Sequence, residues 1–313
     1  MTQPNSTSFF TQHNRFLLLI HHEPDGDAVA SSLALSLALR TLGKYVEVVC
    51  ADPIPAQFQF LPFVQKIKHN FPVEPFDVIV TLDCGDSKRT GYQAHLKALL
   101  KQKSTILINI DHHPKNDLHS LAHHNLVDYE APSTSYLVYK VIHGLGVPLN
   151  HKLATCLLTG LYTDTGGFKH PNTTPETLKF ASLLLSYGAR LKDITSHITQ
   201  PSTVRRLKLW GVALSRIQRH PEFNIISTYI THDDIKKTQT KEEDIGGIAA
   251  LLGTIPAEVA VLVVQLGDGT TQVRMRTKNK WINLVPLANY LGGGGQKKAA
   301  GFALRDFVPV LMN

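Results

Sequence analysis

Short apolar segments alternate with helical patterns through the first two hundred residues, and this alternation constrains the fold more than any other feature of the sequence. Such an order is typical of a mostly parallel sheet with helices on both faces, an α/β fold. The predicted strands are Arg15–Ile20, Tyr45–Cys50, Asp77–Leu82 and Thr105–Ile110. The predicted helices among them are Ala28–Leu42, ended by Gly43, and Tyr92–Lys101.

After Asn125 the pattern becomes mainly helical. The predicted helices are Ser133–His143, Lys152–Tyr162, Thr174–Tyr187, Leu191–Ile198 and a basic helix, Ser202–Arg219. Three further strands, Asn224–Ile230, Glu258–Leu266 and Thr271–Thr277, and a glycine-rich loop, Gly292–Gly295, indicate a smaller α/β unit. We therefore expect one domain over residues 1–198 and a second over residues 223–313. A linker helix over residues 199–222 would join them, with a hinge near residues 196–203.

The composition favours a globular protein with an anionic partner. Lys and Arg number 32 against 25 Asp and Glu, and the pI is about 9.2, which favours nucleotides, nucleic acid or acidic membrane surfaces. The three cysteines, Cys50, Cys84 and Cys156, lie far apart, which argues against a disulfide framework or a zinc–thiolate site and favours the cytoplasm. No segment approaches the ~20 apolar residues that span a bilayer, so no membrane partner is expected.

Four clusters of acidic residues and histidines follow predicted strands or helices. HHEPDGD (residues 21–27) follows the first strand, DCGD (83–86) the third, and DHH (111–113) the fourth, whereas TDTGGF (163–168) follows a helix. The first two clusters are each also compatible with a helix cap, whereas two adjacent histidines after an aspartate at a strand end are rarely structural. Ligands of an open α/β sheet bind beyond the carboxyl ends of its strands, so three clusters at such ends favour one shared site.

The ligand types indicate which cation such a site would hold. Histidine with carboxylates and no thiolate suits manganese, iron, cobalt or magnesium better than structural zinc. The carboxylates suffice for two ions, and paired ions about 3.5–4 Å apart clamp the attacking and leaving oxygens of a phosphoryl transfer. The clusters therefore predict metal-dependent phosphate chemistry.

These segments resemble the DHH phosphoesterase superfamily, which is named for the Asp-His-His found here at residues 111–113. HHEPDGDA, LDCGD, IDHH and LYTDTGGF stand in the family's order, and VRMRTK and GGGGQKKAAGF resemble its DHH-associated substrate-binding domain. The resemblance covers nearly the whole chain. Length and domain pairing most resemble the branch of bifunctional oligoribonucleases and 3′-phosphoadenosine-5′-phosphate phosphatases, the nano-RNases.

The resemblance implies two Mn²⁺ ions per chain, with Mg²⁺ or Co²⁺ as alternatives. His21 and Asp25 would hold the first ion, and Asp83 would bridge both. The second ion would be held by Asp27, His112 and Asp164.

The resemblance also implies roles around the metals. Asp111 would support the metal ligands, and His113 would contact the scissile phosphate or assist the leaving oxygen. Ser133 and Thr134, in EAPSTS, match a family segment near the site, but a helix N-cap explains them better than direct catalysis.

Substrate contacts are expected in the second domain. The implied residues are Arg276, Gly293, Gly294, Gly295, Gln296 and Lys297. Arginine can bind a phosphate through two bonds, and a glycine-rich loop followed by lysines can present N–H groups and charge to one. Gln296 replaces the family's usual histidine, so this position keeps hydrogen bonding but loses the possibility of charge.

The expected function is hydrolysis of short oligoribonucleotides, of 3′-phosphoadenosine 5′-phosphate, or of both. A second copy of the chain, forming a homodimer, is a candidate partner. One alternative is a phosphodiesterase of linear or cyclic dinucleotides, and a manganese pyrophosphatase is a weaker one. A nucleotide-binding regulator with a drifted substrate clamp is the alternative outside the enzymes.

Overall fold

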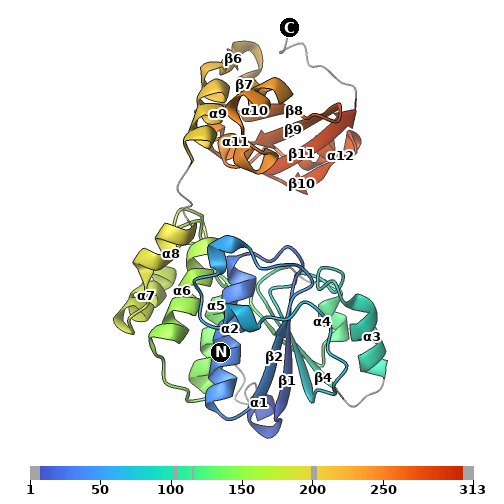
Figure 1. Cartoon of the computed structure of the whole chain (residues 1–313), viewed down its shortest axis with the longest axis vertical. Coiled ribbons are helices and arrows are strands. Elements are labelled where there is room, and N and C mark those ends of the chain that lie inside the picture. Colours follow the sequence, from blue (N-terminus) through green and yellow to red (C-terminus); the bar gives the residue numbers. More distant parts are fainter. Residues whose placement is uncertain (1–7, 102–104, 115, 199–202, 306–313) are drawn as a thin grey trace. The chain divides into compact units, whose positions relative to one another are not determined.

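The computed structural model describes residues 8–101, 105–114, 116–198 and 203–305 (Figure 1). The chain divides into two compact units, Met1–Gln200 and Pro201–Asn313, and each has its own sheet. Within the described ranges, no helix is long and apolar enough to cross a membrane.

The first unit is built on a five-stranded sheet whose neighbouring strands are all parallel, in the order β2-β1-β3-β4-β5. The strands are β1 (Arg15–Ile20), β2 (Tyr45–Val49), β3 (Val78–Leu82), β4 (Ile106–Asp111) and β5 (His124–Val127). β1 and β3 are almost wholly buried because both faces of the sheet are covered. The predicted parallel sheet is thus confirmed.

Helices cover the two faces of this sheet (Figure 1). α2 (Gly26–Thr41), α5 (Thr134–Gly144) and α6 (His151–Asp164) lie on one face, and α3 (Gln93–Lys101) and α4 (Leu118–Leu121) on the other. The remaining helical segments are α1 (Ser8–Gln12), η1 (Ala56–Phe58), η2 (Val64–Lys66), α7 (Pro175–Ser186) and α8 (Leu191–Ile198).

α2 is the central helix of the first unit and carries part of the site at its start. It packs against β1 on one side and against α5 and α6 on the other, so most of its residues are buried. Asp25 caps it by accepting hydrogen bonds from the N–H groups of Asp27 and Ala28. The first turn of α2 is thereby held at the end of β1.

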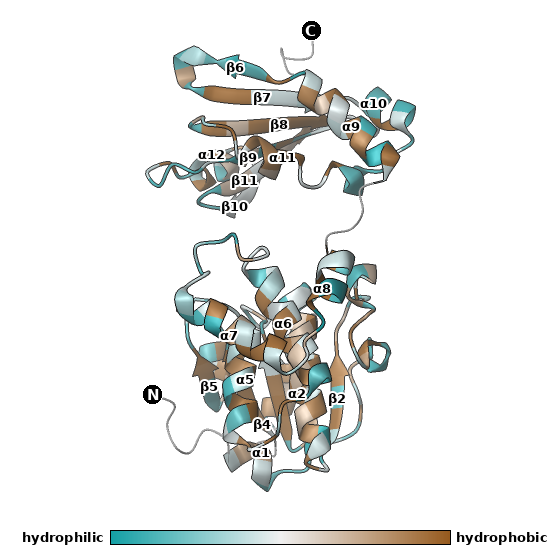
Figure 2. Ribbon diagram, turned by 90° about the vertical axis from the view of Figure 1, so that its left-hand side faces the viewer, coloured by the Kyte–Doolittle hydropathy of each residue, from teal (hydrophilic) through white to brown (hydrophobic). Residues whose placement is uncertain are grey.

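The second unit has a mixed six-stranded sheet in the order β10-β11-β9-β8-β7-β6, in which only β7 and β8 pair in parallel. Its strands are β6 (Gln218–His220), β7 (Ile225–Ile230), β8 (Val259–Gln265), β9 (Thr270–Arg276), β10 (Gly294–Gln296) and β11 (Ala299–Arg305). In Figure 2 the inner strands β7 and β8 are largely hydrophobic, whereas the edge strand β6 is hydrophilic.

Two apolar clusters cover this second sheet. Residues of α9 (Val204–Ser215), α10 (His232–Thr238) and α11 (Ile248–Leu252) form one, and residues of α12 (Val285–Tyr290) join the other. Two 3-10 turns, η3 (Pro221–Phe223) and η4 (Glu242–Ile245), complete the unit. The predicted smaller α/β unit is confirmed.

Three differences from the sequence-based expectations concern the connecting segment and the second unit. The basic helix expected to extend to Arg219 ends at Ser215, and Ser202 lies outside the described residues. This helix, α9, is no free linker, because Leu209 and Ala213 are buried in the core of the second unit. The glycine-rich segment is only partly a loop, because its last two glycines begin strand β10.

Candidate metal centre

Three groups of ligand-type side chains form at the edge of the first sheet where β1, β3 and β4 end. The strand order reverses between β1 and β3, and ligands of parallel sheets bind at such a switch point. Within each group, the ligand atoms lie within 4.8 Å of one another. The groups are His21, Asp25 and Asp83; Asp27, His112 and Asp164; and Asp83, His112 and His113. All six residues expected to bind metal are therefore brought together, and Asp83 belongs to two groups.

His21 presents a free nitrogen to its group. Its Nδ1 lies 2.7 Å from the carbonyl oxygen of His22, which can only accept, so Nδ1 carries the hydrogen. Nε2 of the neutral ring then has a lone pair. It is buried, has no hydrogen-bond partner among the described residues, and lies 3.8 Å from Oδ1 of Asp25. An orphaned buried nitrogen facing a carboxylate fits a metal ligand.

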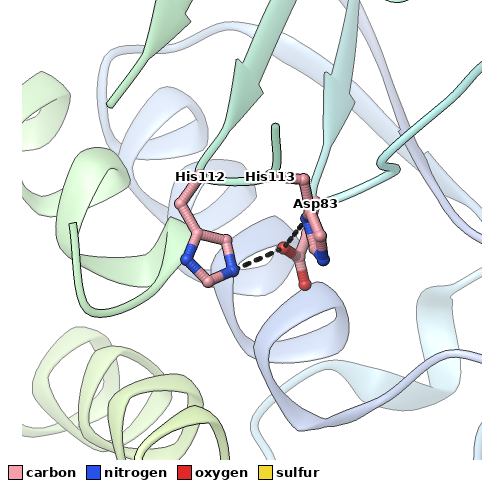
Figure 3. A group of neighbouring side chains, drawn as sticks. All are labelled: Asp83, His112 and His113. Carbon is pink, nitrogen blue, oxygen red and sulfur yellow. Dashed lines mark ion pairs between the residues drawn. The ribbon is translucent and has the colours of Figure 1, made fainter. Parts of the chain in front are cut away.

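His112 is oriented in the same way. Its Nδ1 lies 3.2 Å from the carbonyl oxygen of Ala131, which leaves Nε2 to face the acids. Nε2 lies 3.3 Å from Oδ2 of Asp164 and 3.6 Å from Oδ1 of Asp83. Figure 3 shows His112 and His113 converging on one oxygen of Asp83.

Two residues at the start of α5, Thr134 and Ser135, hold Asp27 in place. Oδ2 of Asp27 accepts a hydrogen bond from the backbone N–H of Thr134 (2.5 Å). Oδ1 accepts from the backbone N–H (3.0 Å) and the hydroxyl (2.5 Å) of Ser135. Ser133 is the N-cap of α5, as the simpler interpretation predicted. The sequence signal for these contacts was the run of hydroxyl residues in EAPSTS. These residues form the start of α5, which lies against Asp27.

Asp83 adopts a backbone conformation that is uncommon for a residue with a side chain. Its φ is 59°, in the left-handed region, and its side chain is buried. Its Oδ1 accepts a hydrogen bond from the hydroxyl of Thr134 (2.8 Å), which fixes the carboxylate. Such strained positions cluster at functional sites because the surrounding structure must hold them.

The carboxylates of this site crowd one another. Burial and the neighbouring Asp164 raise the pKa of Asp27 to about 7. Burial and Asp25 raise the pKa of Asp164 to about 7, and burial with Asp27 raises the pKa of Asp83 well above its usual range. Buried negative charges without counter-charge favour proton or cation binding. The donor set and its charge thus fit divalent cations.

Asp25 differs from these three acids because hydrogen bonds stabilise its charge. Burial raises its pKa, but the interaction with His21 and the N–H of Ala28 outweigh burial and lower it. Asp25 is therefore both the cap of α2 and a member of a ligand group.

Asp111 and His113 form a hydrogen-bonded pair behind Asp83. Oδ1 of Asp111 accepts from the backbone N–H (3.0 Å) and from Nδ1 (2.7 Å) of His113, while Oδ2 accepts from the N–H of Gly85 (2.9 Å). Burial raises the pKa of Asp111. The bonds from His113 and Gly85 lower it by more than burial raises it, so the pKa lies below its usual value. The bond to Asp111 raises the pKa of His113 despite burial. His113 can thus carry a proton on Nε2 while Asp111 holds Nδ1.

Gly160 of α6 makes the close packing at this site possible. A Cβ added there would lie 2.0 Å from Oγ of Ser135 and 2.3 Å from Oδ1 of Asp27. The sequence alone gives no signal for this glycine, because the constraint arises from segments far apart in the chain.

In the second unit, two of the residues expected to bind substrate lie in one row of the sheet. Ala299 of β11 pairs with Arg276 of β9 on one side and with Gln296 of β10 on the other. Directly opposed residues of antiparallel strands point to the same face, so Arg276 and Gln296 flank a small alanine. Burial and the neighbouring Arg274 lower the pKa of Arg276, whose Nη1 donates to the carbonyl oxygen of Met275.

The glycines of this segment have packing reasons as well. A Cβ at Gly293 would lie 2.1 Å from the carbonyl oxygen of Gly301, and one at Gly295 would lie 2.5 Å from that of Ala299. The N–H of Gly293 already donates to Ala288 at the end of α12 (2.8 Å), so it is not a free phosphate donor. Among the described residues, a Cβ at Gly294 would meet only the side chain of Asn289, at 3.9 Å, and Lys297 is exposed.

Comparisons with known proteins agree with these features. "DHH family, N-terminal domain" matches residues 15–161, and "DHHA1 domain" matches residues 223–310. The chain is 33% identical over 291 residues to the bifunctional oligoribonuclease and PAP phosphatase NrnA of Thermus thermophilus, covering 91% of this chain and 82% of that protein. The protein of the same name from Bacillus subtilis is 26% identical over 299 residues, with 93% and 90% covered.

A solved structure shows the same fold. An exopolyphosphatase-related protein from Bacteroides fragilis matches with a TM-score of 0.84 and 24% identity, over 98% of this chain and 92% of that one. The family resemblance found in the motifs is therefore confirmed across both units. The chain belongs to the DHH phosphoesterase family.

Proposed function

We propose that this enzyme uses two divalent cations to hydrolyse short oligoribonucleotides, 3′-phosphoadenosine 5′-phosphate, or both. The observation that carries the proposal is the membership of Asp83 in two ligand groups, which suits one carboxylate shared by two cations. The substrate class is taken from two relatives, each named as a bifunctional oligoribonuclease and PAP phosphatase.

The proposed ligands follow the geometry of the groups. One cation would be held by His21 and Asp25, and the other by Asp27, His112 and Asp164. Asp83 would bridge both, because it belongs to the first group and its Oδ1 lies 3.6 Å from Nε2 of His112 in the second. When bound, such cations neutralise phosphoryl oxygens and act as Lewis acids. We propose Mn²⁺, with Mg²⁺ or Co²⁺ as substitutes, because imidazole and carboxylate ligands suit these ions.

The protein's own proton chemistry would come from His113 and Asp111. Asp111 binds Nδ1 of His113, which fixes the ring and stabilises its charged form. Nε2 can then donate a hydrogen bond to a phosphate oxygen and deliver a proton to the leaving oxygen. His113 is thus the proposed catalytic residue, and Asp111 positions it.

The second unit would bind the substrate. Arg276, Gln296 and Lys297 supply cationic and hydrogen-bonding groups, and a partly buried arginine with a lowered pKa gains from an anionic ligand. In this proposal residues 1–198 are the catalytic domain and residues 223–313 form most of the substrate-binding domain, to which α9 and β6 also belong. Of the proposed hinge, residues 196–203, positions 199–202 lie outside the described residues. A cytoplasmic location is proposed because all three cysteines are free thiols.

A turnover screen with Mn²⁺ tests this function. The substrates are 3′-phosphoadenosine 5′-phosphate, di- to pentaribonucleotides, linear dinucleotides such as pGpG, and pyrophosphate. Asp83→Ala should abolish turnover, whereas Asp193→Ala, which removes only a surface ion pair in α8, should not. Turnover confined to pyrophosphate, or full activity of Asp83→Ala, would refute the proposal.

A further inference from the structure

The segment between β9 and α12, residues 278–283, lies beside the glycine-rich hairpin of the second unit. Before it, the N–H of Thr277 donates to the carbonyl oxygen of Lys298 (3.1 Å), and after it, the N–H of Leu284 donates to that of Lys297 (3.0 Å). Within the segment, Oδ1 of Asn279 accepts from the N–H of Trp281 (2.9 Å). The segment is therefore fixed next to the two lysines that follow β10.

Trp281 is the residue of this segment that packing does not explain. It is 81% exposed, although Leu284 is buried and Ile282 packs against the same core. The ammonium group of Lys280 lies 5.2 Å from the centre of its ring. An exposed flat ring beside a cation is a feature of surfaces that bind single-stranded nucleic acid, where bases stack on aromatic side chains.

The surroundings of Trp281 are strongly cationic. Residues 269–305 contain seven Lys or Arg and no Asp or Glu. Arg274 pairs with Gly301, and Gly301 pairs with Gly294. This row of paired residues lies two residues along each strand from the row that contains Arg276 and Gln296. Since alternate residues of a strand share a face, both rows form a strip in which arginines flank residues with little or no side chain. Such a strip is complementary to phosphates and lies at the strand ends that lead to Trp281.

We propose that Trp281 stacks on a base of the substrate whose phosphates lie along the Arg274–Arg276 strip. This inference rests on the proposed function, because it takes the ligand to be a nucleotide or a short RNA. It adds a specificity-determining residue that would favour phosphate esters carrying a base. The preference would tolerate any base, since every base offers a flat face.

Steady-state kinetics with three variants test the contact. Trp281→Ala should raise KM for a 5′-phosphorylated ribodinucleotide about tenfold and leave kcat within about twofold. Trp281→Phe should recover most of the loss because it keeps a ring. Phe223→Ala is the matched control, an aromatic residue 69% exposed between β6 and β7, and should behave as wild type. With a dinucleotide whose stacking base is replaced by an abasic sugar, Trp281→Ala should match wild type.

A binding measurement separates this inference from the proposed function. The chain has two tryptophans, so Trp210→Phe leaves Trp281 as the reporter. A non-hydrolysable ribodinucleotide should quench its fluorescence, whereas pyrophosphate should not. If wild type hydrolyses dinucleotides but Trp281→Ala has an unchanged KM, the base contact is refuted and the function stands. Quenching without hydrolysis refutes the function and supports the contact. If neither quenching nor hydrolysis is observed, both the function and the contact are refuted.

Discussion

Replacing Gly160 by alanine should damage metal binding without weakening the helix that carries it. The new Cβ would lie 2.0 Å from Oγ of Ser135 and 2.3 Å from Oδ1 of Asp27, whereas Cβ contacts below 3.0 Å essentially never occur. The hydroxyl must therefore move by about 1 Å and the carboxylate by about 0.7 Å. Ligand distances tolerate only about 0.2 Å. Helix propensity by itself favours alanine over glycine by ~1 kcal/mol.

The expected result is a loss of metal affinity, because displaced supporting groups typically cost about 10–100-fold. Calorimetric titration of Gly160→Ala with Mn²⁺ measures it, and circular dichroism checks the fold. Gly211→Ala is the control, since Gly211 lies inside helix α9 and, apart from the helix backbone itself, no atom of the described residues lies within 4 Å of the added Cβ. It should gain stability and keep wild-type metal affinity. Wild-type affinity in Gly160→Ala would refute the steric argument for Asp27.

Three other substitutions probe separate interactions. Thr134→Val removes the hydroxyl bonded to Asp83 and should lower metal affinity about 10–100-fold; an unchanged titration would contradict this. Gln296→His should lower KM up to about fivefold with kcat nearly unchanged, because a charged donor adds roughly 1 kcal/mol of uniform binding; a large rise in kcat would instead mark a catalytic role. Asp234→Asn should cost ~1.5–3 kcal/mol in urea unfolding at pH 7, since it breaks the paired bonds from Arg216. Burial raises the pKa of Asp234, but those bonds lower it by more, so the pKa lies below its usual value. The difference in unfolding free energy between wild type and Asp234→Asn should therefore shrink as the pH falls below ~4, and the same difference at pH 3 as at pH 7 would contradict this.

Strands β1, β3, β4 and β8 could be predicted because each is mainly a run of apolar residues between polar turns. β1 and β8 match their predicted limits within about a residue. β5, β6, β10 and β11 were missed. β5 is short and polar, and the Gly and Ala residues of β10 and β11 have little strand propensity of their own, so pairing with β9 sets their conformation.

The metal centre was likewise predictable only in part. Its four clusters were identifiable because three follow predicted strands and one follows a predicted helix, and the family resemblance implied which of their residues bind metal. Thr134, Ser135 and Gly160 were not connected with Asp27, because their roles depend on α5 and α6 packing against the start of α2. A sequence shows which groups have suitable chemistry, but tertiary packing decides which neighbours hold them.

Every strand of the first sheet precedes every strand of the second, and each apolar cluster lies within one unit. The order of synthesis on the ribosome therefore matches the order of the two sheets. Once the first two hundred residues have emerged, the first sheet has all its strands and all six proposed metal ligands. At about 5–20 residues per second, the rest of the chain takes several seconds more, which is long compared with the folding of most domains. The nascent first unit can thus fold and acquire its cations while the second is still being translated.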